Sequence, residues 1–357
     1  MSDVRKVLIA AGGTGGHVFP ALAVADELKA RDITVVWVGT QRGLESQLVP
    51  QWGYPIKTLR VSALRGRGLA SRLRGVSRLC VSLFQSLKLM RCEGPQAVLG
   101  MGGYVAGPVC VAARLLNKRT IMHEQNAVAG FTNRLIKNFA SRVLEAVPGT
   151  FASKVNAVHT GNPVRSDILE IDAPEVRMRG RTGPLRVLLV GGSQGAQALN
   201  CLLPEAVASL DQDIVVRHQA GRGNLEATAR AYGDQPQIEV VEFISDMAEA
   251  YAWADVLICR AGAMTVAEIA AVGIASVLVP YPYAVDDHQT ANGQYLVDAG
   301  AAVMIQEASL SAQSLAQQLT SLTADRQQLI AMASNARQVS RRNATQLVVN
   351  EILGEVA

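Results

Sequence analysis

The sequence predicts an α/β protein made of two doubly wound parallel sheets, one in each half of the chain. Strand-like apolar runs alternate with helical patterns along almost all of the 357 residues. Continuous runs of Val, Ile and Leu are typical of parallel strands that helices cover on both faces. A glycine-rich turn follows the first strand-like run of each half. The length is sufficient for about two domains, each with its own core.

The expected strands follow one another in a regular order. In the first half they are residues 4–11, 33–39, 97–101, 120–123 and 142–145, and in the second half 185–190, 213–218, 238–243, 255–259, 276–280 and 302–305. A stretch rich in proline, glycine and charge, residues 172–184, separates the two sets. We therefore expect domains at 1–163 and 164–340, with a last helix within 341–357 that can pack on either. The loops at the carboxyl ends of the strands are expected to line a cleft between the domains.

Composition narrows the range of functions. The chain is 49% hydrophobic and 18% charged with a net charge of +4, as in ordinary globular proteins. Aromatic residues make up only 4%, which disfavours nucleic-acid binding by base stacking. The five cysteines form no CxxC pair, so neither a zinc knuckle nor a disulfide framework is favoured. Because the first residues pass directly into a strand and lack a signal-peptide core, we expect a reduced protein on the cytosolic side.

The first glycine turn, residues 12–17, reads Gly-Gly-Thr-Gly-Gly-His. Such a turn lets a bulky, anionic group approach the free N–H groups at the start of a helix. It is no P-loop, because no lysine follows, and an NAD site is disfavoured because strand 33–39 ends without an acidic residue. His17 at the helix start is kept neutral by the helix dipole and is a candidate general base. Alternatively, it only binds substrate or braces the loop.

Further turns of this kind occur at other strand ends. Residues 191–195 read Gly-Gly-Ser-Gln-Gly, 100–104 read Gly-Met-Gly-Gly-Tyr, and the polar residues 123–126 end another strand. Residues 260–268 again pass from a strand to a helix through small residues, and Glu268 falls one turn into that helix. Its carboxylate either meets the vicinal hydroxyls of a ribose or only complements the helix dipole. Asp211 and Asp213 fit a solvated turn better than a metal motif, and no metal is expected.

Residues 64–91 form a basic, amphipathic segment. It holds seven basic residues and no acidic one, namely Arg65, Arg67, Arg72, Arg74, Arg78, Lys88 and Arg91. Apolar residues recur at helical spacing, namely Leu69, Leu73, Val76, Cys80, Leu83, Phe84 and Leu87. This pattern is typical of a segment that lies on an anionic membrane surface. The alternative is that the apolar stripe packs on the sheet while the arginines face water.

Together these motifs resemble the MurG family of glycosyltransferases. The resemblance rests on residues 12–17, 100–104, 123–126, 161–165, 191–195, 243–247, 260–265 and 288–289, which match in order over nearly the whole chain. It implies a GT-B fold, in which two Rossmann-like domains face each other across a cleft and the C-terminal helix 341–357 returns to the first domain. The implied activity is transfer of N-acetylglucosamine from UDP-N-acetylglucosamine to undecaprenyl-pyrophosphoryl-muramyl pentapeptide (lipid I) at the cytoplasmic face of the bacterial inner membrane. No cofactor is implied.

The resemblance also implies roles for individual residues. In the second domain, Ile244 would meet the uracil, Glu268 the ribose, and Gln289 the sugar. Ser193 and the turn 263–265 (Ala263, Met264 and Thr265) would hold the diphosphate. Val266 and Ala267, which follow this turn, are also expected among the substrate-binding residues. Arg165 would lie near the nucleotide and Asn126 near the sugar. The acceptor side would be lined by Thr14, Gly15, Gly16 and His17, with Glu124 as a second candidate base.

Three other functions remain open from the residues alone. A UDP-sugar epimerase would use the same architecture and would need neither a lipid acceptor nor the basic segment 64–91. A non-catalytic UDP-sugar sensor that docks on membranes would leave the glycine turns of the first domain without a role. An NAD enzyme is the least favoured, for want of the acidic residue.

Overall fold

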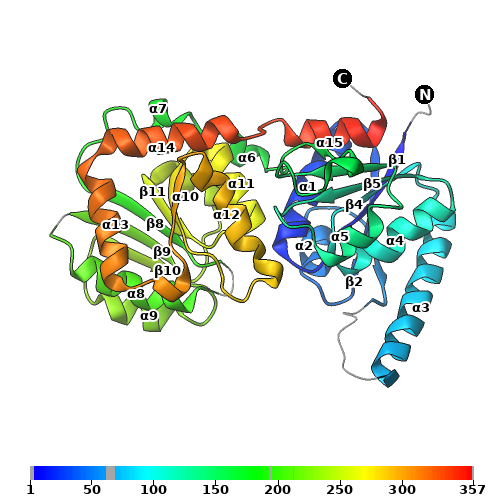
Figure 1. Ribbon diagram of the computed structural model, residues 1–357, viewed down its shortest axis with the longest axis horizontal. Coiled ribbons are helices and arrows are strands. Elements are labelled where there is room, and N and C mark those ends of the chain that lie inside the picture. Colours follow the sequence, from blue (N-terminus) through cyan, green and yellow to red (C-terminus); the bar gives the residue numbers. More distant parts are fainter. Residues whose placement is uncertain (1–3, 62–68, 193–194, 212, 356–357) are drawn as a thin grey trace. The chain divides into compact units, whose positions relative to one another are not determined.

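The computed structural model describes residues 4–61, 69–192, 195–211 and 213–355, and its chain divides into two compact units. The first unit comprises Met1–Arg165 and Arg341–Ala357, and the second comprises Ser166–Ser340. Each unit is built around one parallel β-sheet, with helices on its faces (Figure 1). The α/β class and the two doubly wound parallel sheets are thereby confirmed.

The sheet of the first unit has the strand order β3-β2-β1-β4-β5-β6-β7. The strands are β1 (Lys6–Ala10), β2 (Thr34–Thr40), β3 (Ile56–Leu59), β4 (Ala97–Gly100), β5 (Arg119–Glu124), β6 (Arg142–Glu145) and β7 (Val158–His159). The helices are α1 (Gly15–Ala30), α2 (Glu45–Gln51), α3 (Leu69–Glu93), α4 (Gly103–Leu115), α5 (Phe131–Ile136), η1 (Ser153–Val155) and α15 (Ala344–Leu353). The winding direction reverses between β1 and β4, and the carboxyl ends of such strands are where α/β proteins bind ligands.

Successive side chains of the central strands point to opposite faces of this sheet, and a buried core lies on each face. Val7 and Ile9 of β1 belong to one buried cluster, with apolar residues of α1 and α15, whereas Leu8 and Ala10 belong to another, with residues of α4. All four side chains are fully buried. Continuous apolar strands are therefore explained by helices on both faces, as the sequence predicts.

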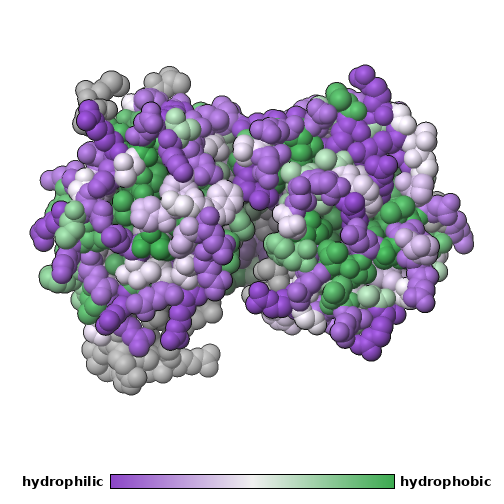
Figure 2. Space-filling view, turned by 180° about the vertical axis from the view of Figure 1, so that it is seen from behind, coloured by the Kyte–Doolittle hydropathy of each residue, from purple (hydrophilic) through white to green (hydrophobic). Residues whose placement is uncertain are grey.

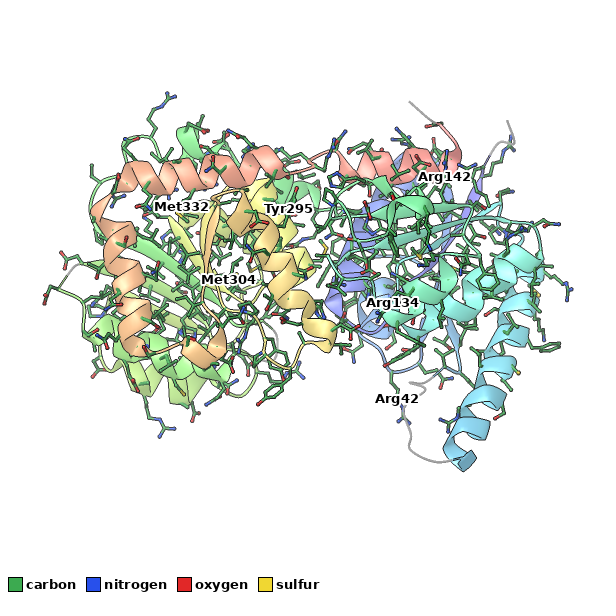
Figure 3. All side chains as sticks on the ribbon, in the orientation of Figure 1. Arg42, Arg134, Arg142, Tyr295, Met304 and Met332 are labelled. Atoms are coloured by element: carbon green, nitrogen blue, oxygen red, sulfur yellow. The ribbon has the colours of Figure 1, made fainter. Side chains whose placement is uncertain are left out.

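Helix α15 belongs to the first unit, although the second unit lies between it and the rest of the first unit in the sequence. It lies beside α1 (Figure 1), and its apolar residues Val348, Val349 and Ile352 are fully buried in the cluster on that face. Two arginines of the first unit bind polar side chains of α15. Arg31 donates to Asn350 at 3.1 Å. Arg142 of β6 (labelled in Figure 3) forms an ion pair of 3.4 Å with Glu351.

The second unit has the strand order β10-β9-β8-β11-β12-β13, also fully parallel. The strands are β8 (Leu185–Val190), β9 (Ile214–Gln219), β10 (Ile238–Val241), β11 (Val256–Cys259), β12 (Ala275–Leu278) and β13 (Ala302–Met304). The helices are α6 (Ser166–Leu169), α7 (Pro174–Arg177), α8 (Gln197–Ala208), α9 (Leu225–Tyr232), α10 (Met247–Trp253), α11 (Ala263–Val272), η2 (Val285–Asp287), α12 (His288–Asp298), η3 (Glu307–Ser309), α13 (Ala312–Ala324) and α14 (Arg326–Val339). Here the winding reverses between β8 and β11.

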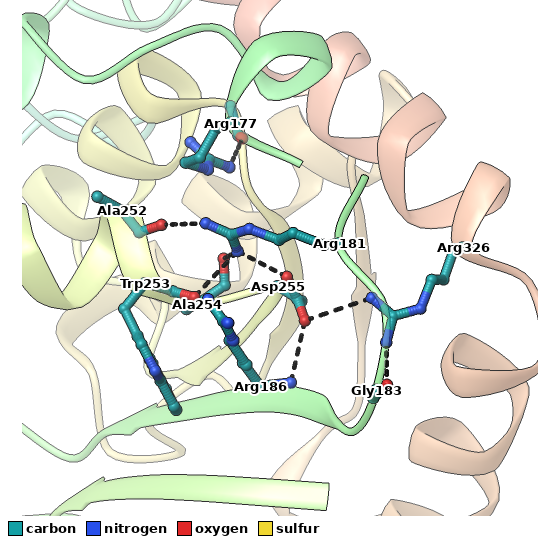
Figure 4. A network of polar contacts seen from close by, with 10 residues as sticks. Arg177, Arg181, Gly183, Arg186, Ala252, Trp253, Ala254, Asp255 and Arg326 are labelled. Atoms are coloured by element: carbon teal, nitrogen blue, oxygen red, sulfur yellow. Dashed lines mark hydrogen bonds and ion pairs between the residues drawn. The ribbon is translucent and has the colours of Figure 1, made fainter. Parts of the chain in front are cut away.

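A buried carboxylate ties the amino-terminal edge of this second sheet together. Asp255, which is 1% exposed, accepts hydrogen bonds from Arg181 Nη1 at 2.7 Å and from the amide of Arg186 at 3.1 Å (Figure 4). Arg326 of α14 lies 3.8 Å from its other oxygen. Elsewhere in the unit, Tyr295 of α12 (labelled in Figure 3) donates to the carbonyl of Val339 at the end of α14. Asp255 thus joins β8 to α14, and Tyr295 joins α12 to α14.

The strands expected from the sequence agree with the structure except at the two edges of the first sheet. All six expected strands of the second unit and five in the first unit are present, but β3 and β7 were missed. Strand β3 has exposed polar residues at Lys57 and Thr58, and β7 is only two residues long. Edge strands bury little surface, so neither one needs a continuous apolar run.

Helix α3 differs in part from the expected apolar stripe. Leu83 and Leu87 pack against the core of the first unit, but Cys80 is exposed and Phe84 is 70% exposed. The buried side instead carries Ser82, Ser86 and Met90, because the serine hydroxyls bond to carbonyls of their own helix. Arg65, Arg67 and the side chains of Leu69, Arg72, Leu73, Arg74 and Val76 lie outside the described residues.

The surface seen from behind Figure 1 is mostly hydrophilic. Hydrophobic residues gather there in separate patches on both units (Figure 2). Within the ranges that the structure describes, no helix combines the length and the apolar character needed to cross a bilayer.

Candidate active site

The carboxyl ends of β1, β4 and β5 bring three sequence motifs to one edge of the first sheet. Ala10 pairs with Gly100, and Gly100 pairs with Met122. The turn 12–17, the cluster 100–104 and the polar residues 123–126 therefore begin side by side. The sequence predicted each motif, and the register of the strands explains why they meet.

Glycines allow the first two motifs to touch. A Cβ added to Gly103 would lie 2.3 Å from the carbonyl oxygen of Gly12, and one added to Gly102 would lie 2.8 Å from the ring of His17. Both glycines also have positive φ angles, 100° and 75° for Gly102 and Gly103, which side chains disfavour. Their role is therefore to admit the His17 ring and the Gly12 backbone, in addition to turning the chain.

The hydrogen bond of His17 defines its reactive nitrogen. His17 lies in the first turn of α1, half-buried, with Nδ1 at 3.2 Å from the Gly12 carbonyl oxygen and 3.5 Å from Thr14 Oγ1. A carbonyl oxygen only accepts, so the ring must carry its proton on Nδ1. Nε2 is then the nitrogen with a lone pair, as a general base requires. Thr14 and Gly13 are exposed beside it, while Gly15 and Gly16 are half-buried in the helix start.

A buried carboxylate that the sequence analysis missed supports this turn. Glu45, the first residue of α2, is 0% exposed, and its Oε2 accepts the amide of Gly13 at 2.9 Å. Its Oε1 accepts both the amide and the hydroxyl of Thr40, each at 2.7 Å. Cβ atoms at Gly12, Gly39 and Gly43 would lie 2.1–2.5 Å from Glu45 atoms, so these three glycines make the space for it. Nothing local in the sequence signals this contact between residues 32 apart.

The amide of Gly13 is therefore not available to an anion. The glycine turn was expected to present its N–H groups to an anionic ligand, but at Gly13 this donor is used inside the protein. The negative charge of Glu45 beside it further disfavours a phosphate at that position. For Gly13 the expectation is wrong, because the tertiary fold places a carboxylate there.

Glu124 has a structural role that disfavours it as a base. It is 1% exposed, and Oε1 accepts the amide and the side chain of Asn126 at 3.0 and 3.1 Å. Oε2 accepts the amide of Gly130 at 2.9 Å and the side chain of Asn133 at 2.8 Å. A carboxylate has about four lone-pair positions, and these four donors fill them. Glu124 therefore orders the loop that carries Asn126, which is itself half-buried.

His123 and Gln125 are likewise used within the protein. His123 is fully buried, and its Nε2 donates to the carbonyl of Gly161 at 3.0 Å while Nδ1 accepts from Gln125 at 3.1 Å. Burial lowers the pKa of His123 to about 4. Asn162 donates to the carbonyl of Gln125 at 3.0 Å. Arg165 is the last residue of the first stretch of the first unit, and its guanidinium lies 6.0 Å from the ring of Phe19 in α1.

In the second unit, the loops after β8, β11 and β12 meet at one edge. Val190 pairs with Cys259, and Cys259 pairs with Leu278. The glycine at position 195 lets the loop after β8 pack closely against the backbone of Ala220, because a Cβ at Gly195 would lie 2.3 Å from the Ala220 carbonyl oxygen. Ser193, which was expected to hold the diphosphate, lies outside the described residues.

Helix α11 begins at this edge. Gly262 is its N-cap, and Ala263, Met264 and Thr265 form its half-buried first turn. The N–H groups of a first turn have no partner within the helix and suit an anion. Val266 differs, because its side chain is buried and its amide already donates to the Gly262 carbonyl. Ala267 follows it inside the helix, so the geometry does not favour contacts of Val266 or Ala267 with a ligand.

Glu268 and Ile244 are held by residues that the sequence analysis did not single out. Tyr251 of α10 is buried and donates to Glu268 Oε2 at 2.9 Å. The amide of Ile244 donates to the side chain of buried Gln219 at 3.3 Å. Both supports are sequence-distant, and only the packing of α10 and β9 brings them near.

Arg260 connects the loops after β11 and β12, and Gln289 of α12 makes a contact with the second of these loops. Gln289 accepts the amide of Tyr281 at 2.9 Å. Arg260 donates to the carbonyls of Val279 and Pro280 at 3.1 and 3.3 Å, and its guanidinium also pairs with Glu307 at 2.5 Å. Two loops that leave neighbouring strands are thus fixed to each other. In the part of the chain described, no group of three or more His, Cys, Asp or Glu residues is arranged to hold a metal ion.

Comparison with known proteins decides the family. The model of the glycosyltransferase family 28 N-terminal domain matches residues 7–145, and that of its C-terminal domain matches residues 186–348. The chain belongs to glycosyltransferase family 28. Curated relatives named UDP-N-acetylglucosamine–N-acetylmuramyl-(pentapeptide) pyrophosphoryl-undecaprenol N-acetylglucosamine transferase include that of Alkalilimnicola ehrlichii, 51% identical over 98% of both chains. That of Nitrosococcus oceani is 49% identical over 99% of both chains.

A crystal structure of a similar enzyme has the same fold. The crystal structure of Acinetobacter baumannii MurG superposes with a TM-score of 0.85 at 43% identity, covering 98% of this chain and 99% of that one. The expected resemblance to MurG and the GT-B class of the fold are thereby confirmed. The chain is accordingly a glycosyltransferase, and the turns at the ends of β1, β4, β8 and β11 are the places to look for its substrates.

Proposed function

We propose that this protein transfers N-acetylglucosamine from UDP-N-acetylglucosamine to the 4-hydroxyl of the muramyl sugar in lipid I, with inversion at the anomeric carbon. The observation that carries the proposal is identity of about half the residues, over nearly the whole chain, to enzymes named for this transfer. The reaction serves peptidoglycan synthesis. The local geometry of each unit supplies groups that suit one of the two substrates.

The second unit is proposed to bind the donor. The first-turn amides of α11 at Ala263, Met264 and Thr265 would hold the diphosphate, because helix N-termini attract negative charge. Glu268, oriented by Tyr251, would accept hydrogen bonds from the ribose hydroxyls. The backbone carbonyl of Ile244 would recognise the uracil edge, because its amide already donates to Gln219, and Gln289 would contact the sugar. As the bond from the anomeric carbon to the phosphate oxygen breaks, the helix start stabilises the growing charge on UDP.

The first unit is proposed to bind the acceptor and to supply the base. His17 Nε2 would take the proton of the attacking hydroxyl, whose oxygen then bonds to the anomeric carbon from the face opposite UDP. Thr14, Gly15, Gly16 and Asn126 would position the acceptor and the transferred sugar, and Arg165 would lie near the nucleotide. Glu124 is not retained as a base, because its oxygens are occupied by the loop that it orders.

The transfer assay uses radiolabelled UDP-N-acetylglucosamine and a short-chain lipid I analogue. The expected result is a labelled disaccharide product that forms only with the acceptor present. A UDP-sugar epimerase would instead change the donor with no acceptor, and a sensor would bind the donor without turnover. Either result would refute the proposed transfer, and lack of affinity for UDP would refute the donor site as well.

We further propose that the first unit docks on the anionic cytoplasmic face of the inner membrane. Helix α3 exposes Leu79, Val81 and Phe84 to solvent, and Arg78, Lys88 and Arg91 are exposed on the same helix. Apolar residues inserted among basic ones are the usual composition of a surface that binds anionic lipid. Such a surface would keep the enzyme beside its lipid-linked acceptor.

Vesicle sedimentation tests this docking. The protein is expected to sediment with vesicles containing phosphatidylglycerol and to be released by salt, whereas pure phosphatidylcholine should retain little of it. Phe84→Ser should weaken the sedimentation, while the exposed control Val176→Ser in the second unit should not. Equal binding of both vesicle types, or no effect of Phe84→Ser, would argue against this surface.

A further inference from the structure

The peptide unit between Gly12 and Gly13 is hydrogen-bonded on both sides by side chains. Its N–H, on Gly13, donates to Glu45 Oε2 at 2.9 Å, and its C=O, on Gly12, accepts from His17 Nδ1 at 3.2 Å. In a trans peptide the N–H and C=O point in opposite directions, so the carboxylate and the imidazole lie on opposite sides of one planar group. The described part of the chain contains no cis peptide bond.

We propose that Glu45 is a positioning residue that acts on His17 through this peptide. The ionised carboxylate pulls on the Gly13 N–H and thereby increases the negative charge on the Gly12 oxygen, since hydrogen bonds in a chain polarise one another. A more negative oxygen holds the Nδ1 proton of His17 more firmly. The ring is then fixed as the Nδ1–H tautomer, and in the neutral ring Nε2 carries the lone pair.

The surroundings of Glu45 fit this role better than a purely structural one. The side chain is completely buried, and the space for it depends on the absence of side chains at Gly12, Gly39 and Gly43. One of its oxygens is already bound by two donors of Thr40, and the other is directed at the Gly13 amide. The turn is further confined by Gly103 at the Gly12 oxygen, so the peptide cannot rotate away easily.

The isosteric variant Glu45→Gln tests the contact to Gly13 apart from the contacts to Thr40, because it replaces only one of the two carboxylate oxygens. The amide oxygen should stay with the two Thr40 donors, which leaves the NH2 group facing the Gly13 N–H, where two donors oppose each other. Glu145→Gln is the matched control, because Glu145 is also a buried carboxylate of the first unit that accepts two loop amides, from Gly149 and Phe151. Glu145 ends β6, and strands β4 and β5 separate β6 from β1, which the glycine turn with His17 follows.

The test is the tautomer of His17, read from ring 15N shifts in the full chain with labelled histidine. There are five histidines, and loss of one signal in His17→Gln assigns the resonance. The wild type and Glu145→Gln should show the Nδ1–H form. Glu45→Gln should show a growing share of the Nε2–H form, with kcat for transfer lowered about tenfold and the KM for the donor unchanged.

The inference rests on the proposed function only for its kinetic part. If the wild type transfers no sugar, the proposed function fails, and the tautomer measurement still decides whether Glu45 acts on His17. A wild-type ring in the Nε2–H form would overturn the inference without any variant. So would a loss of rate in Glu45→Gln with an unchanged tautomer, since that shows a structural role alone. Glu45→Asp, which withdraws the carboxylate from Gly13, replaces Glu45→Gln if the latter does not fold and should give the same tautomer change.

Discussion

The hydroxyl of Tyr251 lies 2.9 Å from Glu268 Oε2, which joins helix α10 to the start of helix α11. Because Tyr251 is buried, its hydroxyl cannot exchange this partner for solvent, and the Glu268 carboxylate is oriented before any ligand arrives. Preorganisation of this kind favours binding of a diol without changing the chemical step.

Tyr251→Phe is therefore expected to weaken donor binding. Losing one hydrogen bond to a charged group costs about 1.5 kcal/mol, which is roughly a tenfold rise in the KM for UDP-N-acetylglucosamine with kcat little changed. Steady-state kinetics with varied donor measures both constants. A fall in kcat at constant KM would place Glu268 in the chemical step instead of in ribose binding.

Replacing His17 should remove the general base. His17→Ala is expected to lower kcat by about 10²–10⁴, because a positioned base contributes that much to proton transfer. The affinity for UDP, measured by calorimetry, should stay the same, since His17 lies in the first unit and the donor groups lie in the second. A nearly normal rate would exclude His17 as the base.

Glu124→Gln should act on the fold and not on the base. Four donors bind the Glu124 oxygens, and the variant must place its NH2 group against some of them. We expect the free energy of unfolding to fall by about 1–3 kcal/mol, while the acidic limb of the kcat–pH curve remains. Denaturant titration and a pH series give the two results. Loss of the acidic limb would restore Glu124 as a base.

Two buried histidines make stability depend on pH. Burial lowers the pKa of His123 and of His218 to about 4 in the folded protein, against about 6.5 in the unfolded chain. Between these values the unfolded chain binds more protons, so stability is present above pH 6.5 and is lost as the pH falls towards 4. Each histidine can contribute roughly 3 kcal/mol to this loss.

Unfolding curves between pH 7 and pH 4 measure this effect. His218→Gln removes one titrating group and should flatten the decline of the free energy of unfolding with falling pH. The variant loses the hydrogen bonds of neutral His218 to Tyr232 and Asn200. In the wild type, the stability that depends on neutral His218 is already largely lost at pH 4. The variant should therefore lower the free energy of unfolding less at pH 4 than at pH 7. An unchanged slope would contradict the assignment of His218 as a buried neutral group.

Asp255 should be a major determinant of stability in the second unit. Asp255→Ala leaves Arg181, which is 15% exposed, without its carboxylate partner, and breaking a buried pair in this way costs about 3–5 kcal/mol. The pair of half-buried Arg217 and exposed Glu249, 2.7 Å apart, is the control, and Glu249→Ala should cost at most about 1 kcal/mol. Denaturant unfolding compares the two variants. Equal costs would show that the Asp255 network contributes little.

The sequence by itself determined the α/β class, the strands of both sheets apart from two edges, and the motifs of the first and second units. These features follow from local patterns: apolar runs specify buried strands, and glycines specify turns that start helices. It also led to His17 as the candidate base and to Glu268 as a candidate ligand of the ribose.

Only the tertiary structure decided which of the polar side chains are already used within the protein. Glu124 resembles a catalytic carboxylate in the sequence, but Gly130 and Asn133 fold back onto it. Glu45 has no motif at all, yet it reaches the Gly13 amide. The physical reason is that a hydrogen bond depends on a position within a few tenths of an ångström, and strand pairing and helix packing set that position between residues distant in the chain.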